Sequence, residues 1–173
     1  MKHILVITLL AEDRPGIVES LSRTVAGHQG NWVESSLLAL AGQFAGVLMA
    51  ELPESEVADC LAELDELRET GLNIQVAVAS APVVQPGYKI FDLELIGHDR
   101  PGIVRDITHI LAKHQVNVEV LNTEVQEASM TGETLFVANA RIQVGDSTSL
   151  EDLQEELEAL ANELMVDIKL ENE

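Results

Sequence analysis

The sequence predicts an α+β protein built from two consecutive βαββαβ units, and three observations carry that prediction. The hexapeptide Asp-Arg-Pro-Gly-Ile-Val occupies residues 13–18 and returns at residues 99–104. Around each copy, alternating apolar runs typical of strands and apolar residues at helical spacing follow one another in the same order. Between the copies, residues 82–87 hold two prolines and a glycine, which favours a linker.

The repeat extends well beyond the hexapeptide. When residue 13 is placed on residue 99, further matches follow through the next helix and into the next strand: Leu21 on Ile107, Ala26 on Ala112, His28 and Gln29 on His114 and Gln115, and Asn31 on Asn117. We therefore expect one domain over residues 1–81, a linker over 82–87 and a second domain over 88–173.

The first half of each unit is expected to run strand, helix, strand. Residues 3–10 and 88–96 are apolar runs typical of strands. A helix follows each hexapeptide, and helical spacing predicts one apolar stripe on each, formed by Val18, Leu21 and Val25 in the first copy and by Val104, Ile107 and Leu111 in the second. Residues 31–42 and 116–128 are the next expected strands.

The second half of each unit is expected to run strand, helix, strand again. The strands are residues 43–52 and 133–144, with a turn at 129–132. The helices that follow carry apolar residues at helical spacing: Val57, Leu61, Leu64 and Leu67 in the first copy, and Leu150, Leu153, Leu157 and Leu160 in the second. Ser149 with Asp152 resembles an acidic capping box, and Gly71 suits a helix end. Residues 72–79 and 164–171 are the closing strands.

This order is that of a ferredoxin-like unit, in which right-handed crossovers place both helices on one face of a four-stranded antiparallel sheet. In the last strand, Val166, Ile168 and Leu170 alternate with charged residues, so we expect one face of that strand to be exposed to solvent. Residues 4–10 and 44–50 are apolar on both faces. We therefore expect the first sheet to pack against a second sheet or a partner chain.

Composition excludes several classes of function. Among 173 residues, 30 are acidic and 10 basic, and the net charge of −20 repels phosphate backbones, so we expect no direct binding of nucleic acid. No apolar run approaches the roughly 20 residues of a membrane span. The single cysteine, Cys60, cannot form an intrachain disulfide and is expected as a small buried apolar group, which favours a cytoplasmic location.

The hexapeptide lies where the first strand of each unit ends and the first helix begins. Asp13 and Asp99 are expected to cap the helix, and a proline fits its first turn. Gly16 and Gly102 would let a ligand approach the backbone, where free N–H groups suit an anion such as a carboxylate. The same residues also make a good structural turn, and the residues alone leave both readings open.

The order βαββαβ, the hexapeptide at the first turn, and His-Gln-Gly-Asn (28–31) or His-Gln-Val-Asn (114–117) before the second strand resemble the ACT domain. The resemblance covers essentially the whole chain as two copies. Two such domains with no catalytic or DNA-binding domain between them are similar to the glycine cleavage system transcriptional repressor family.

The resemblance implies a regulatory protein that binds a small amino acid, glycine being one candidate, and acts on a transcription-factor protein. It also implies a homo-oligomer formed through ACT sheets or helices. By match to the family's loop, the ligand-binding residues would be Asp13, Arg14, Gly16, Ile17 and Asn31 in the first copy, and Asp99, Arg100, Gly102, Ile103 and Asn117 in the second. Ala11-Glu12 stands where the second copy has Gly97-His98, so the two sites need not be equivalent.

We expect no catalytic residue, no metal site and no cofactor. The five histidines show no spacing that favours a metal, because His109 and His114 point to different sides of a helix. Two alternatives stay open: an interaction module that has lost its ligand, and an acylphosphatase-like hydrolase using the pairs Arg14 and Asn31 or Arg100 and Asn117. The second lacks a glycine-rich phosphate cradle.

Overall fold

The structure is a computed structural model that describes residues 2–79, 87–127 and 134–172. The chain divides into two compact units, residues 1–84 and residues 85–173, and each is described by itself. Most of the predicted linker and the turn predicted at 129–132 lie outside the described residues.

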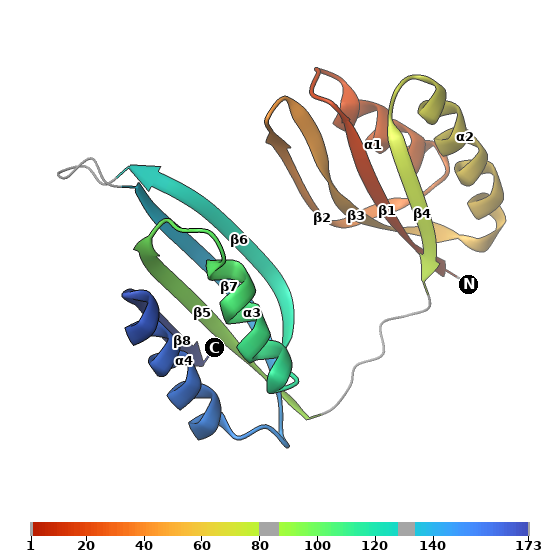
Figure 1. Cartoon of the computed structure of the whole chain (residues 1–173). Coiled ribbons are helices and arrows are strands. Elements are labelled where there is room, and N and C mark those ends of the chain that lie inside the picture. The colour runs from red at the N-terminus through yellow and green to blue at the C-terminus, as the bar shows by residue number, and fades with distance from the viewer. Residues whose placement is uncertain (1, 80–86, 128–133, 173) are drawn as a thin grey trace. The chain divides into compact units, whose positions relative to one another are not determined.

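Unit 1 has the predicted order of elements (Figure 1). Strand β1 (Lys2–Glu12) leads through helix α1 (Ile17–Gly27) to the hairpin of β2 (Asn31–Leu40) and β3 (Gln43–Pro53); a short 3-10 turn (Glu54–Glu56), helix α2 (Val57–Glu69) and strand β4 (Asn73–Ala79) complete it. The strands pair antiparallel in the order β2-β3-β1-β4, so β1 is central.

Unit 2 repeats this plan. Strand β5 (Tyr88–His98) and helix α3 (Ile103–Lys113) precede the strands β6 (Asn117–Glu127) and β7 (Thr134–Gly145); helix α4 (Leu150–Leu164) and strand β8 (Val166–Asn172) follow. The sheet order is β6-β7-β5-β8, again antiparallel throughout. Both units are therefore α+β ferredoxin-like domains, as the sequence predicts.

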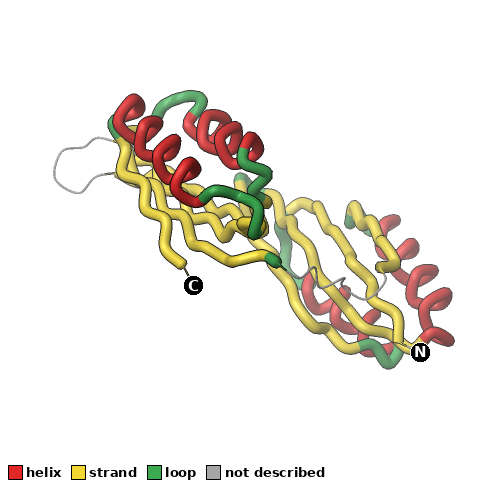
Figure 2. Tube along the Cα trace, turned by 90° about the horizontal axis from the view of Figure 1, so that it is seen from below, coloured by secondary structure: helices red, strands yellow, loops and turns green. Residues whose placement is uncertain are grey.

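Each unit has its own core between one face of its sheet and its two helices. In Figure 2 the helices of each unit lie on one side of that unit's sheet. Strand alternation aims Leu5, Ile7 and Leu9 of β1 and Leu93 and Leu95 of β5 at these helices, and all five are buried. The two clusters of buried residues share no member.

The apolar stripes of α1 and α3 differ slightly from the prediction. Val18 and Val104 are 44% and 40% exposed, and the preceding residues, Ile17 and Ile103, are buried instead. The other predicted members, Leu21, Val25, Ile107 and Leu111, are buried, so only the first residue of each stripe differs from the prediction.

Two helix ends match the prediction. The amide of Asp152 donates to the Ser149 hydroxyl at 3.2 Å, which caps α4. Gly71, with φ +93°, follows the end of α2 in the left-handed region that glycine adopts most readily.

The cysteine that is predicted to be buried lies where expected. Cys60 is fully buried, and burial raises the pKa of its thiol to about 11, so it is an inert apolar group. Trp32 packs against the core of unit 1. In the part of the chain that the structure describes, each helix is too short or too polar to cross a membrane.

The two sheets differ on the face turned away from their own helices, here called the open face. On the first sheet it carries Val6, Leu10, Val47 and Met49, with Leu38 and Leu40 on the edge strand. On the second sheet the first two corresponding rows hold Asp92 and Glu94 of β5, whereas the row that corresponds to Leu10 holds Ile96 and Val137. The apolar open face of unit 1 fits the expected packing against a sheet or partner, which stays a prediction.

Candidate functional site

The candidate site is the pair of strand-to-helix corners, formed by residues 13–18 and 99–104. At each corner a glycine stands immediately before the helix, Gly16 with φ +95° and Gly102 with φ +99°. A Cβ at Gly16 would meet nothing within 4 Å, and one at Gly102 would meet only the flexible side chains of Arg105 and Asp106. The glycines are therefore required by the left-handed backbone rather than by lack of space.

The capping role expected of Asp13 and Asp99 is wrong. Neither α1 nor α3 has a side-chain cap, because the left-handed glycine takes the N-cap position and the aspartate lies three residues before it. The prolines lie in the turn before the helix and not in its first turn. The aspartate amides instead donate to the neighbouring hairpin, Asp13 to the Gly42 carbonyl at 3.0 Å and Asp99 to the Thr134 carbonyl at 3.1 Å.

The corners keep free backbone donors in spite of these contacts. The first helical hydrogen bonds run from Ser20 to the Gly16 carbonyl and from Asp106 to the Gly102 carbonyl, each at 2.9 Å. The amides that precede Ser20 and Asp106 in the first turns therefore have no acceptor within their helix. They lie at the positive end of the helix dipole, where an anion is stabilised.

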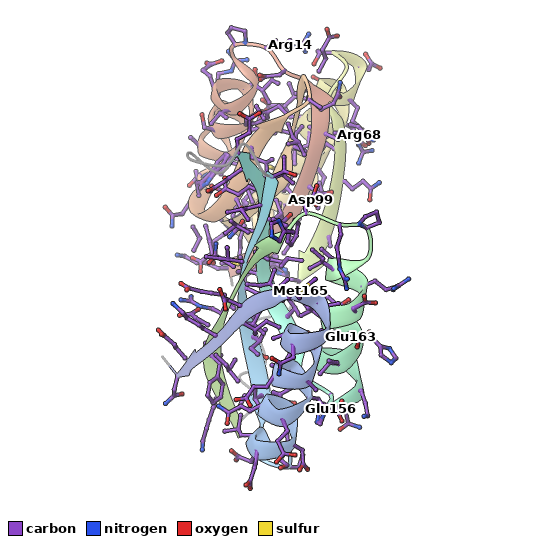
Figure 3. All side chains as sticks on the ribbon, turned by 60° about the vertical axis from the view of Figure 1, so that its left-hand side comes forward. Arg14, Arg68, Asp99, Glu156, Glu163 and Met165 are labelled. Atoms are coloured by element: carbon purple, nitrogen blue, oxygen red, sulfur yellow. The ribbon has the colours of Figure 1, made fainter. Side chains whose placement is uncertain are left out.

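The two arginines of the corners differ. Arg14 donates from Nη2 to the Thr70 carbonyl at 2.7 Å and so ties the first corner to the end of α2 (Figure 3). Arg100 is exposed and hydrogen-bonds to no other described residue. The second corner therefore has a cation available for a ligand, whereas in the first corner a contact within unit 1 already holds the guanidinium.

The structure does not bring Asn31 or Asn117 to the corner of its own unit. Asn31 pairs with Glu51, which pairs with Ile4 near the start of β1, whereas the corner follows the end of β1. Along the strand this separation is about 27 Å, at about 3.4 Å per residue. Asn117 has the corresponding position in unit 2: it pairs with Gln143, which pairs in turn with Ile90 near the start of β5.

This separation bears on the hydrolase alternative. An arginine and an asparagine that act together on one phosphate must lie side by side. Within each unit the arginine and the asparagine stand at opposite ends of the sheet. The arrangement inside a unit therefore does not provide the acylphosphatase-like pair.

Four hollows lie away from the corners. One of about 340 Å³ lies on the open face of the second sheet, one of about 220 Å³ on that of the first, and one of about 310 Å³ between α4 and β8. A small apolar gap of about 20 Å³ lies between α3 and β6. None of these four is lined by a predicted site residue.

Sequence reasoning missed the role of the repeated histidine. In unit 1, His28 follows α1 and reaches two carboxylates, with Nε2 2.9 Å from Glu63 and Nδ1 3.5 Å from Glu56. The buried Thr24 hydroxyl donates to Glu63 at 2.8 Å. These hydrogen bonds, that from Thr24 first and that from His28 second, lower the pKa of Glu63. The cluster joins α1 to α2.

The second unit has a related but different cluster. Lys113 donates to Glu156 at 2.5 Å, and this contact is the main reason that the pKa of Glu156 is lowered. The buried Nε2 of His114 lies 3.5 Å from Glu156 without hydrogen bonding to it. The repeat of His28 and His114 in the sequence is a signal for contacts between two helices. The glutamates that these histidines approach lie too far along the chain to be recognised from the sequence.

Comparison with known proteins identifies the class of domain. Residues 3–77 match one ACT-domain family model and residues 89–166 match another. A protein of unknown function from Galdieria sulphuraria has a solved structure with a TM-score of 0.85 and 28% identity, covering 100% of this chain and 99% of that one.

Two further proteins are similar. A solved structure described as a candidate glycine cleavage system transcriptional repressor has a TM-score of 0.69 and 22% identity, with 100% of this chain and 98% of that one covered, and shows the shared fold. A UPF0237 protein of Methanopyrus kandleri is 34% identical over 88 residues, which are 49% of this chain and 96% of the relative.

Both units are thus domains of the same class. The chain belongs to the ACT-domain family and carries two ACT domains in tandem. This membership supports a regulatory role.

Proposed function

We propose that the protein is a non-catalytic cytoplasmic regulator that binds a small amino acid, glycine being the first candidate, at its strand-to-helix corners. It then modulates transcription through contact with a DNA-binding regulator. The observation that carries this proposal is the duplicated corner, in which a left-handed glycine precedes a helix whose first amides have no acceptor within the helix. An amino acid's carboxylate is an anion that suits such a helix end.

The second corner is the better candidate. Arg100 hydrogen-bonds to no other described residue, and a guanidinium can bind a carboxylate through two parallel hydrogen bonds. Because Asn31 and Asn117 lie far from the corner of their own unit, their part in a site requires another domain or chain beside that corner. This requirement agrees with the homo-oligomer that we propose, formed through ACT sheets or helices.

The test is calorimetric titration of the full chain with glycine and the other common amino acids. We expect Gly16→Ala with Gly102→Ala to weaken binding, because a side chain at φ near +95° distorts the corner. Gly87→Ala is the control, since Gly87 has φ +98° and its added Cβ would meet only the Asp146 side chain, but it lies just before β5, at the opposite end of that strand from the corner. Co-purification from the native cell would then identify the regulator. Absence of any amino-acid ligand contradicts the proposal.

One observation favours the alternative of a module that has lost its ligand in unit 1. The Arg14 side chain is held by the Thr70 carbonyl inside that unit, whereas Arg100 hydrogen-bonds to no other described residue. If the first corner is only structural, Gly102→Ala alone removes binding and Gly16→Ala leaves it unchanged. If regulation survives both substitutions, the corners have only a structural role.

A further inference from the structure

The open face of unit 1 is an exposed apolar surface. In Figure 2 the helices of that unit lie on the other side of its sheet, so they do not cover this face. Its largest apolar side chains are well exposed: Leu10 by 46%, Leu38 by 50%, Leu40 by 69% and Val47 by 40%. A contiguous apolar patch of this kind is typical of an interaction surface.

Strand register defines the residues of this face. Residues that pair across an antiparallel sheet point to the same side, so rows can be followed across the four strands. In the order β2, β3, β1 and β4, three successive rows are Glu34, Met49, Val6 and Ala77; Ser36, Val47, Thr8 and Gln75; and Leu38, Ala45, Leu10 and Asn73. Glu34, on the edge strand, is the one charged residue among these twelve.

The fold does not require an uncharged face at this place. In the order β6, β7, β5 and β8, the corresponding rows of unit 2 are Val120, Arg141, Asp92 and Glu171; Asn122, Asn139, Glu94 and Lys169; and Glu124, Val137, Ile96 and Asp167. Seven of these twelve residues are charged. The same strand pairing therefore accepts a charged open face, so packing inside unit 1 does not explain its apolar one.

The charge of the chain limits what can cover this face. The net charge is −20, so two copies repel each other over most of their surface. In a two-fold dimer each patch meets its own copy, and a face rich in charge would then bring like charges together. The three rows avoid this conflict. The nearest charges lie at their two ends, with Glu12 at one and Glu51, whose carboxylate is 2.9 Å from Lys2 Nζ, at the other.

The size of the face also fits a dimer. Four strands about 4.8 Å apart, with rows about 6.8 Å apart along each strand, span roughly 500 Å² when the adjoining row of Ile4 is included. Because side chains roughen the surface, two such faces bury on the order of 1,000–1,500 Å² together, which reaches the lower part of the range for stable interfaces. Interfaces between identical chains are also the more apolar kind.

We propose that the open face of unit 1 packs against the same face of a second copy of this chain. Sheets packed face to face lie about 10 Å apart with their side chains interdigitated, so Leu10, Val47 and Met49 fill the layer between them. Glu34 then stays at the rim, on the edge strand. The inference rests on the homo-oligomer of the proposed function and deepens it by naming its surface and its partner. It uses no residue of the corners.

The test is sedimentation velocity of the full chain over a wide range of protein concentration. We expect an equilibrium between monomer and dimer, and Val47→Glu to weaken it by at least about tenfold, because two like charges then enter one apolar layer. Val120→Glu is the matched control, since it makes the same substitution on the open face of the second sheet at a side chain 47% exposed. We expect it to leave the association unchanged.

A second variant covers the case in which Val47→Glu fails to fold, which circular dichroism detects. Leu38→Ser with Leu40→Ser removes apolar area from the edge strand β2, and neither side chain belongs to the core of unit 1. This variant should also weaken the dimer. Raising the ionic strength should strengthen the wild-type dimer, because salt screens the repulsion between two acidic chains.

The proposal is contradicted by several results. A chain that stays monomeric at every concentration has no second copy on this face, and protection of Val47→Cys from a thiol reagent in that monomer assigns the cover to another part of the same chain. A dimer that survives both the Val47 and the Leu38 and Leu40 variants uses another surface, which removes this face and keeps the proposed homo-oligomer. Equal weakening by Val120→Glu assigns the effect to added charge. The calorimetric titration of the corner variants is a separate measurement, so loss of this face and loss of amino-acid binding are distinguished.

Discussion

Gly16 and Gly97 show two different reasons for a glycine in this chain. Gly16 is required by a backbone with φ +95° in open space. Gly97, in the strand β5, is required by packing, because a Cβ there would lie 2.1 Å from Cγ1 of Val166. The need for glycine at position 16 can be predicted from the sequence, because the residues around it are typical of a turn. The second depends on a contact between strands far apart in the chain and has no local signal.

Gly97→Ala is expected to destabilise unit 2 by about 1–3 kcal/mol, the usual cost of forcing an extra group into a packed site. Chemical denaturation followed by circular dichroism measures this change. Gly145→Ala is the control, because its added Cβ would lie 3.6 Å from Tyr88 in ordinary contact. Adding Val166→Ala should restore part of the loss. A neutral Gly97→Ala contradicts the close approach of β5 and β8.

Glu63 leads to a prediction about pH. Its pKa is lowered in the folded state by hydrogen bonds from Thr24 and His28. A lowered pKa means stability that is present above the unfolded value of 4.5 and is lost as the pH falls through the folded value. Glu63→Gln should therefore reduce the free energy of unfolding by up to about 1 kcal/mol at pH 7, since the side chain is partly exposed.

The difference between wild type and Glu63→Gln should shrink as the pH falls from 4.5 through the lowered folded value, because the unfolded state of the wild type binds the proton first and the folded carboxylate binds it only at lower pH. Urea titrations at pH 7 and at acid pH measure it. The control is Glu66→Gln, which removes the same charge from the same helix at a carboxylate that pairs with no other described residue. A difference that grows with acid would contradict the assignment.

At the scale of elements, the sequence predicts the order of strands and helices because each element carries its own periodicity. Residues 3–10 and 88–96 predict β1 and β5 to within a few residues at each end. The helix starts are harder to predict from the sequence, since a left-handed glycine can take the N-cap position expected for Asp13. Contacts such as Arg14 with the Thr70 carbonyl join elements that the sequence alone does not bring together.

The cap of α4 is the element-scale prediction. Ser149→Ala removes the acceptor of the Asp152 amide and should cost about 1 kcal/mol of stability in unit 2. Amide hydrogen exchange of residues in the first turn of α4 should report the change directly. Ser149→Asp keeps an acceptor and should keep the stability. Ser36→Ala, on the exposed edge strand β2, serves as the neutral control, and equal losses in all three variants would contradict the capping role.

At the scale of the whole molecule, the main feature is the large negative net charge. The net charge of −20 is expected to weaken the folded state through self-repulsion. The sequence alone establishes this excess. It does not reveal that Asp92 and Arg141 on the open face of the second sheet take the places of Val6 and Met49 on the first, because that contrast needs the register of the strands.

Salt should therefore stabilise the protein. Raising the ionic strength from about 0.01 M to about 0.15 M shortens the screening length from about 30 Å to about 8 Å, and the melting temperature at pH 7 should rise. Scanning calorimetry measures it. At pH 4.4, close to the sequence pI, the same change in salt should have little effect because the net charge is near zero. A melting temperature that falls with salt at pH 7 would contradict the expected repulsion.

The central place of β1 and β5 has a consequence for synthesis on the ribosome. Each is the first strand of its unit to be made, yet both of its sheet neighbours are made later, β3 and β4 for one and β7 and β8 for the other. A nascent chain therefore holds the first strand unpaired until β3 or β7 has emerged, and with one edge still open until the end of the unit has emerged, and pairing over such distances is slow. Chaperones that shield newly made apolar strands should have their greatest effect while residues 13–79 are being translated.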